Sequence, residues 1–228
     1  MFFYYDYYYL VLVVPAILIS LFAQFKVNSA YKKYAEVLSR RGRTANEVTR
    51  DILDRRGLTN VKIEKTPGRL TDHFDPRTNV IRLSEAVSGD TSVASIGVAA
   101  HEAGHAMQYQ DGYAPIKIRN AVLPAANIGS SLSVPLILLG IILSMPVLVD
   151  VGIILFSLVL VFQLITLPVE FNASKRAKET LYECGILAED ELEGASKVLS
   201  AAAFTYVAAA ITTAAQLLRL VLISRRRD

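Results

Sequence analysis

The sequence predicts a mainly α, polytopic membrane protein with three to four transmembrane helices and a small α+β domain. The 228-residue chain is 53% hydrophobic and only 20% charged, and its mean hydropathy is +0.37. It contains four apolar stretches near the roughly 20 residues that a helix needs to cross about 30 Å of hydrocarbon. Lys and Arg number 24 against 21 Asp and Glu, an excess too small to indicate a nucleic-acid partner.

The first apolar stretch, Tyr7 to Phe25, is uncharged, and residues 1–25 are expected to form an N-terminal transmembrane anchor. The aromatic run FFYYDYYY opens it. Tyrosine suits the headgroup layer, where the ring lies in apolar surroundings and the hydroxyl stays hydrated. A cleaved signal peptide is the weaker alternative, because no basic residue precedes the apolar run and no clear small-x-small cleavage site is present.

The second and third stretches predict a transmembrane hairpin over residues 128–169. They run from Ile128 to Val149 and from Val151 to Val169, with Asp150 alone between them. The fourth stretch, Leu199 to Leu218, mixes alanines with polar residues. It either crosses the membrane or packs as a buried helix, and it forms with the basic tail a C-terminal segment over 199–228.

The placement of basic residues predicts the orientation. No Lys or Arg precedes the anchor, whereas seven lie between Lys26 and Arg50. Because such residues are retained on the cytoplasmic side, the polar domain is expected at the cytoplasmic face of the plasma membrane. If the fourth stretch crosses, the triplet Arg225 to Arg227 lies outside, against this rule, so both topologies stay open. The triplet most simply contacts anionic headgroups.

Two polar segments, 26–127 and 170–198, are expected on the same side of the membrane. In the first, Thr44-Ala-Asn-Glu47 forms a capping box and Gly57 suits a C-terminal cap, which predicts a helix over residues 45–56. Short β-branched runs at 61–64 and 80–83, with turn residues 75–79 between them, predict a small sheet or hairpin.

The chemistry is expected in the helix predicted over residues 93–109, which contains His101-Glu102-Ala-Gly-His105. Positions i and i+4 share one helix face, so both imidazoles can bind one zinc ion at about 2.0 to 2.1 Å. Glu102 is rotated by about 100° and can act as general base on a zinc-bound water without ligating the metal. The alternative is a helix with two merely buried histidines, which the apolar surroundings would make costly.

A catalytic zinc site needs a third protein ligand and an open position. Glu170 is the preferred third ligand, because a carboxylate at the end of a 19-residue uncharged run needs a positive partner. The alternatives are His73 as the ligand and Glu170 as a hydrated helix-end residue. Residues 26–127 are therefore expected to be the catalytic domain, and residues 170–198 the segment that supplies the third ligand.

HEAGH, a hydrophobic hairpin and then EFNAS from Glu170 resemble the YugP-type neutral zinc metallopeptidases, and more distantly the HtpX-type and CAAX prenyl membrane proteases. The resemblance extends to LTDHFDPRTNVIRLS at 70–84 and AAFTYVAAA at 202–210. It implies a zincin-like domain with a gluzincin-type site, in which His101, His105 and Glu170 bind zinc and Glu102 is the base.

The resemblance also raises questions about neighbouring residues. The distant relatives usually have E-F-x-A-D, whereas this chain has Ser174 at the last position, so another acidic residue or Ser174 itself must orient a histidine. The resemblance implies an edge strand over the cleft at 70–83, where a peptide can pair. His73 or Tyr206 would then be a donor to the oxyanion, although an ordinary structural role fits each better.

These observations predict a membrane-anchored, zinc-dependent endopeptidase that acts near the cytoplasmic membrane surface. Its partners would be a peptide or membrane-protein substrate and the lipid bilayer. The rival interpretations are a structural or adaptor membrane protein with a structural zinc site, hydrolysis of a lipid amide and, more weakly, a transporter or channel. Cys184, as the single cysteine, excludes an intrachain disulfide, and a role for it as a metal-blocking thiol is disfavoured.

Overall fold

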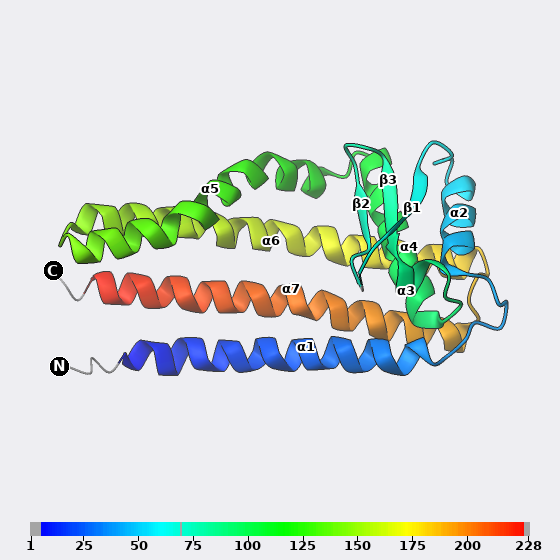
Figure 1. Ribbon diagram of the computed structural model, residues 1–228, viewed down its shortest axis with the longest axis horizontal. Coiled ribbons are helices and arrows are strands. Elements are labelled where there is room, and N and C mark those ends of the chain that lie inside the picture. Colours follow the sequence, from blue (N-terminus) through cyan, green and yellow to red (C-terminus); the bar gives the residue numbers. More distant parts are fainter. Residues whose placement is uncertain (1–5, 69, 226–228) are drawn as a thin grey trace. The chain divides into compact units, whose positions relative to one another are not determined.

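The computed structural model describes residues 6–68 and 70–225, and most of them are helical, as predicted (Figure 1). Much of the N-terminal aromatic run, together with Arg226 and Arg227, lies outside the described residues. The elements in chain order are η1 (Tyr9–Val13), α1 (Val14–Ala35), α2 (Ala45–Arg55), β1 (Lys62–Thr66), β2 (His73–Asp75), β3 (Val80–Ser84), α3 (Glu85–Ser88), α4 (Val93–Gln110), α5 (Ala114–Ile142), α6 (Pro146–Glu183) and α7 (Glu189–Ser224).

The described residues form two compact units. The helical unit comprises residues 6–24, 117–167 and 205–225, and the mixed unit comprises residues 25–116 and 168–204. Helices α1, α5, α6 and α7 each contribute residues to both units.

Among the described residues, four helices are long and apolar enough to cross a membrane: Tyr9–Ala35, α5, α6 and α7. Many of their large apolar side chains are exposed, among them Leu18, Ile128 and Ile154. Exposing such apolar side chains to lipid costs no free energy, whereas exposing them to water is unfavourable. The expectation of a multi-pass membrane protein therefore fits the structure, and the fourth apolar stretch meets the length requirement as part of α7.

The turn of the hairpin lies at residues 143–145, not at Asp150 as the sequence suggested. Ser144 adopts a left-handed conformation with φ of 54°, and the N–H of Met145 donates to the carbonyl of Gly140 at 2.8 Å. This pattern closes α5, and Pro146 then begins α6, where its missing N–H costs nothing. Asp150 is thus one turn inside α6, and the proline is a better guide to the boundary than the charge.

The helical unit also contains ionisable residues that lie outside the bounds of the predicted spans but inside the observed helices. Asp150 lies within α6, and Arg219 lies within α7, one residue beyond the predicted end of the fourth stretch. The Nε of Arg219 donates to Asp6 at 2.7 Å, so this charge is paired. Ser20 and Thr212 add a hydroxyl pair at 2.8 Å between α1 and α7.

The mixed unit contains a three-stranded sheet in the order β1-β3-β2 (Figure 1). The two predicted β runs are neighbours, as expected, but β1 pairs with β3 in parallel. The predicted turn instead joins β2 to β3 in an antiparallel hairpin with Phe74 opposite Ile81. Strand β2 has only three residues, too few for an alternating pattern to indicate it. The family resemblance implied an edge strand at residues 70–83; β2 is at the edge of the sheet, whereas β3, which includes residues 80–83, is its central strand.

Helix α2 confirms the predicted capping box. The Oγ1 of Thr44 accepts from the N–H of Glu47, and the Glu47 carboxylate accepts from the N–H of Thr44. Its apolar face, which includes Ile52 and Leu53, packs into a core that also contains α4 and parts of β3, α6 and α7. Helix α4 therefore lies at the centre of the mixed unit, with most of its residues buried.

Candidate metal centre

The HEAGH sequence lies in the middle of α4. The helix begins after Ser92, whose Oγ accepts from the N–H of Ser95 at 3.2 Å. The Asp90 carboxylate in turn accepts from the hydroxyls of Ser92 and Ser95. Although burial opposes it, these hydrogen bonds hold the pKa of Asp90 below its usual range. A fixed start sets the rotation of α4, and the rotation decides where the histidines point.

Because Gly104 has no side chain, the backbones of α4 and α6 can lie in direct contact at this position. A Cβ atom on Gly104 would lie 2.5 Å from the carbonyl oxygen of Ala173 and 3.2 Å from its Cα. Any other residue would push the two helices apart. Since Ala173 follows Glu170 by less than one turn, this contact brings the Glu170 carboxylate to the histidine face of α4.

His101, His105 and Glu170 converge, and their ligand atoms all lie within 4.8 Å of one another. The Oε2 of Glu170 is 3.3 Å from Nε2 of His101 and 3.7 Å from Nε2 of His105. The two imidazole rings are nearly perpendicular, at 84°. Both rings therefore present the same nitrogen toward one carboxylate oxygen.

The arrangement fits a zinc ion. Ligand atoms at about 2.0 to 2.1 Å from a tetrahedral centre lie about 3.3 to 3.4 Å apart, close to the two separations observed. The Oε2 of Glu170 is buried and has no hydrogen-bond partner among the described residues. A buried carboxylate oxygen that accepts no hydrogen bond is costly, and positive charge at the three ligand atoms, such as a metal ion, would remove that cost.

The electrostatics of His105 are dominated by carboxylates. Burial by itself would lower the pKa of His105, but the neighbouring Glu170 and Glu102 outweigh burial and raise it. The cluster thus attracts positive charge, whether that charge is a proton or a metal ion. Metal binding must displace the proton, because imidazole ligates in its neutral form.

Glu102 lies beside this cluster but outside it. Its side chain is buried, and Oε2 accepts from the backbone N–H of Phe74 on β2 at 3.0 Å. The Phe74 ring packs edge-on against Tyr109 of α4, with ring centroids 5.5 Å apart. The edge strand thereby positions the carboxylate of Glu102. Sequence reasoning missed this contact, because nothing local links Phe74 to the HEAGH segment.

Each histidine has a partner at its second ring nitrogen. The Oγ of Ser174 is 3.1 Å from Nδ1 of His101, so Ser174 takes the place for which the sequence left an orienting residue open. Nδ1 of His105 is 3.0 Å from Oε1 of Gln108. Sequence reasoning missed Gln108, although a glutamine three residues after a histidine on a helix shares its face.

The other residues considered from the sequence lie elsewhere. His73 is exposed on β2, and its Nδ1 is 2.8 Å from the carbonyl of Thr71. His73 is not part of the cluster of His101, His105 and Glu170. The structure therefore does not place this alternative third ligand at the site. Cys184 packs at the edge of the apolar core. Tyr206 belongs to the part of α7 in the helical unit.

Comparisons with known proteins identify the family. The chain is 48% identical over 212 residues to the "Putative membrane protease YugP" of Bacillus subtilis (strain 168), a match that covers 93% of this chain and 94% of that protein. No solved structure matches the chain. The family model described as "Putative neutral zinc metallopeptidase" matches residues 9–225. The resemblance seen in the sequence is thereby confirmed, and the chain belongs to this family of neutral zinc metallopeptidases.

Proposed function

We propose that the protein is a membrane-anchored, single-zinc endopeptidase with a gluzincin-type site in a zincin-like domain. His101, His105 and Glu170 would hold the metal, and Glu102 would act as the general base. The observation that carries the proposal is the convergence of two imidazoles and one buried, unpartnered carboxylate oxygen from two helices. Family membership and the membrane-protease relative support the same class of activity.

The number of ligands favours a catalytic site over a structural one. Structural zinc sites in proteins are closed by four protein ligands, whereas catalytic sites keep one position for water or substrate. Within residues 6–68 and 70–225, the cluster contains three His, Cys, Asp or Glu ligands and no fourth. A carboxylate held beside the ligands, as Glu102 is, has no use in a structural site.

Zinc bound here would supply Lewis-acid activation of a water molecule and of the scissile carbonyl. The chain's own contribution is proton transfer. Glu102 would accept a proton from the attacking water and later return it to the leaving amine. Phe74 holds only Oε2 of this carboxylate, and the described residues offer no hydrogen bond to Oε1. That second oxygen is therefore available to take the proton.

The outer edge of β2 suits an extended peptide. Phe74 directs its N–H away from β3 and toward Glu102, so its carbonyl points away from β3 as well. A substrate strand would pair there by strand addition. It would then lie beside Glu102, the residue that must reach the scissile bond.

We further propose that the substrates are segments close to the membrane on its cytoplasmic side. Helix α6 is a candidate membrane span that also carries Glu170. The basic residues that follow the first span, absent from its N-terminal side, support the cytoplasmic orientation. A cleavable segment of a membrane protein, or a peptide lying on the bilayer, would meet these requirements.

The test is zinc content and proteolysis of the full chain in detergent. Wild type should bind one equivalent of zinc and cleave casein. Glu102→Gln should keep the zinc and lose at least about a hundredfold in rate, since general-base catalysis contributes about 10² to 10⁴. Glu179→Gln is the matched control and should remain active, because Glu179 is an exposed residue of α6 that forms an ion pair with Lys175. A zinc-free wild type, or full activity of Glu102→Gln, would refute the proposal.

A further inference from the structure

Gln108 is a fully buried polar side chain that the proposed reaction does not use. Its exposed fraction is 0%, and it lies on α4 one turn after His105. Burying an amide is tolerated only when its polar atoms are paired. Gln108 meets this demand through three contacts: with His105, with the backbone of α6 and with Asn172.

The backbone contact determines how the amide is oriented. Nε2 of Gln108 lies 2.7 Å from the carbonyl oxygen of Val169, and a carbonyl can only accept. The NH₂ group of Gln108 must therefore face Val169, which leaves Oε1 facing Nδ1 of His105. An amide oxygen accepts only, so Nδ1 of His105 must carry the hydrogen.

The rest of the contacts agree with this orientation. Oδ1 of Asn172 accepts from Nε2 of Gln108 at 3.0 Å and from Nε of Arg176 at 2.8 Å. A guanidinium can only donate, so the oxygen of Asn172 is assigned independently. Arg176 is in turn paired with Asp111. The chain of hydrogen bonds from His105 to Arg176 thus has one consistent direction.

The consequence for His105 is a single tautomer. With the hydrogen on Nδ1, the lone pair of the neutral ring lies on Nε2, the atom that faces Glu170. The same Gln108 side chain binds the carbonyl of Val169, the residue directly before Glu170. One amide therefore connects a ligand on α4 with the backbone that presents the ligand on α6.

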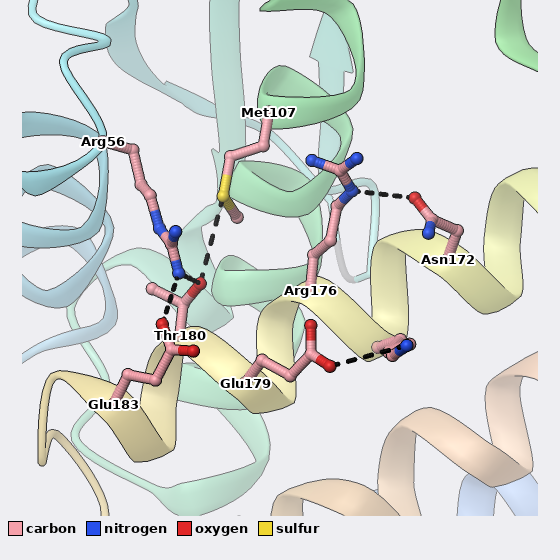
Figure 2. A pocket seen from close by; sticks show the side chains of 8 residues that line it. Arg56, Met107, Asn172, Arg176, Glu179, Thr180 and Glu183 are labelled. Atoms are coloured by element: carbon pink, nitrogen blue, oxygen red, sulfur yellow. Dashed lines mark hydrogen bonds and ion pairs between the residues drawn. The ribbon is translucent and has the colours of Figure 1, made fainter. Parts of the chain in front are cut away.

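We infer that Gln108 is a positioning residue for the metal centre, which sets the tautomer of His105 and ties the two ligand-bearing helices together. The inference rests on the proposed zinc site. Asn172 and Arg176 act behind Gln108. Both line a hollow of about 220 Å³ at the surface of the mixed unit, and Figure 2 shows Arg176 reaching Asn172 along its wall. The chain of hydrogen bonds thereby runs from a buried ligand to solvent.

The experiment compares Gln108→Met with Gln110→Met in the full-length protein in detergent. Methionine matches glutamine in length but cannot hydrogen-bond in this way. Gln110 lies on the same helix, is exposed and makes one long contact, 3.3 Å, with the carbonyl of Arg56. Loss of an orienting partner of a metal ligand weakens metal binding about 10- to 100-fold. Measured by chelator competition, the zinc affinity of Gln108→Met should fall by this factor, whereas that of Gln110→Met should change less than twofold.

A second readout does not depend on metal or activity. In the zinc-free protein, at a pH where the three histidines are neutral, ¹⁵N NMR should show His105 with its hydrogen on Nδ1 in wild type and Gln110→Met. In Gln108→Met it should show a mixture of tautomers. Unchanged zinc affinity together with an unchanged His105 tautomer in Gln108→Met would overturn the inference. Because zinc-free protein suffices, this result does not depend on whether the protein is a peptidase.

Gln108→Glu and Asn172→Leu keep the inference testable if Gln108→Met does not fold. The glutamate retains an acceptor for Nδ1 of His105, but its carboxylate can donate to neither Val169 nor Asn172. It should preserve the tautomer and bind zinc with an affinity between those of wild type and Gln108→Met. Asn172→Leu removes only the outer partner and should cost less than tenfold. Loss of the Nδ1 hydrogen in Gln108→Glu would contradict the inference.

Discussion

The carbonyl oxygen of Ala173 lies 2.5 Å from the point where a Cβ atom on Gly104 would stand. This contact joins the HEAGH helix to the helix that carries Glu170. It explains why the fourth position of HEAGH is glycine in this chain, since no side chain fits between the two backbones.

Gly104→Ala should therefore weaken zinc binding by at least tenfold and destabilise the mixed unit by about 1 to 3 kcal/mol, the usual cost of overpacking. Alanine normally stabilises a helix interior relative to glycine by about 0.5 to 1 kcal/mol. A decrease in the free energy of unfolding of Gly104→Ala would therefore indicate the steric clash. Gly89→Ala is the control, because a Cβ atom there meets nothing within 4 Å. Thermal unfolding and chelator competition measure both effects, and equal behaviour of the two variants would count against the contact.

Glu170→Gln should separate metal binding from stability. At a pH where both histidines are neutral, the buried Oε2 accepts no hydrogen bond and is unfavourable without metal, whereas a neutral amide can donate to an imidazole. The zinc-free variant should unfold at the same temperature as wild type or higher. At free zinc a hundredfold above its dissociation constant, wild type should gain about 2.7 kcal/mol, and the variant far less. Equal stabilisation of both by zinc would show that Glu170 is not a ligand.

Phe74→Ala should lower catalysis without removing the metal. The ring holds β2 against Tyr109, and such aromatic pairs contribute about 0.5 to 1.5 kcal/mol beyond their burial. Loosening β2 frees Glu102 from the N–H of Phe74, so kcat should fall by about tenfold while zinc content stays at one equivalent. Loss of zinc in this variant would mean that β2 supports the ligands and not the base.

The lowered pKa of Asp75 predicts that the stability of the protein falls as the pH is lowered below 4. Hydrogen bonds from the Thr78 hydroxyl, the N–H of Arg77 and the Arg82 side chain lower the pKa of Asp75 from 3.8 to about 2. Because the folded pKa is depressed, the stabilisation is fully present above pH 3.8 and is lost as the pH falls toward 2. Asp75→Asn should therefore lose less stability than wild type between pH 4 and 2, followed by circular dichroism. Parallel curves for the two proteins would exclude this contribution.

Local signals in the sequence predicted the local parts of the structure. The Thr44 capping box fixes the start of α2 through contacts within four residues, and the i, i+4 spacing of His101 and His105 places both on one helix face. These features depend only on neighbours along the chain, so a pattern in the sequence is enough to find them.

Features set by contacts between distant segments were harder to predict. Strand β2 is formed by pairing with β3 and by its bond to Glu102, and three residues carry no periodicity of their own. The contact of Gln108 with Val169 depends on how closely α4 and α6 pack, which spacing does not reveal. The charge of Asp150 wrongly suggests the centre of the hairpin turn, whereas Pro146 marks the start of α6.

The mixed unit is discontinuous in sequence, and this has a consequence for biosynthesis. Residues 25–116 leave the ribosome with both histidines but without the glutamate, and residues 117–167 must be synthesised before Glu170 exists. The nascent chain therefore cannot assemble the three-ligand cluster until the intervening hairpin has been translated. If the cluster binds zinc as proposed, metal loading cannot precede the synthesis of residues 117–167.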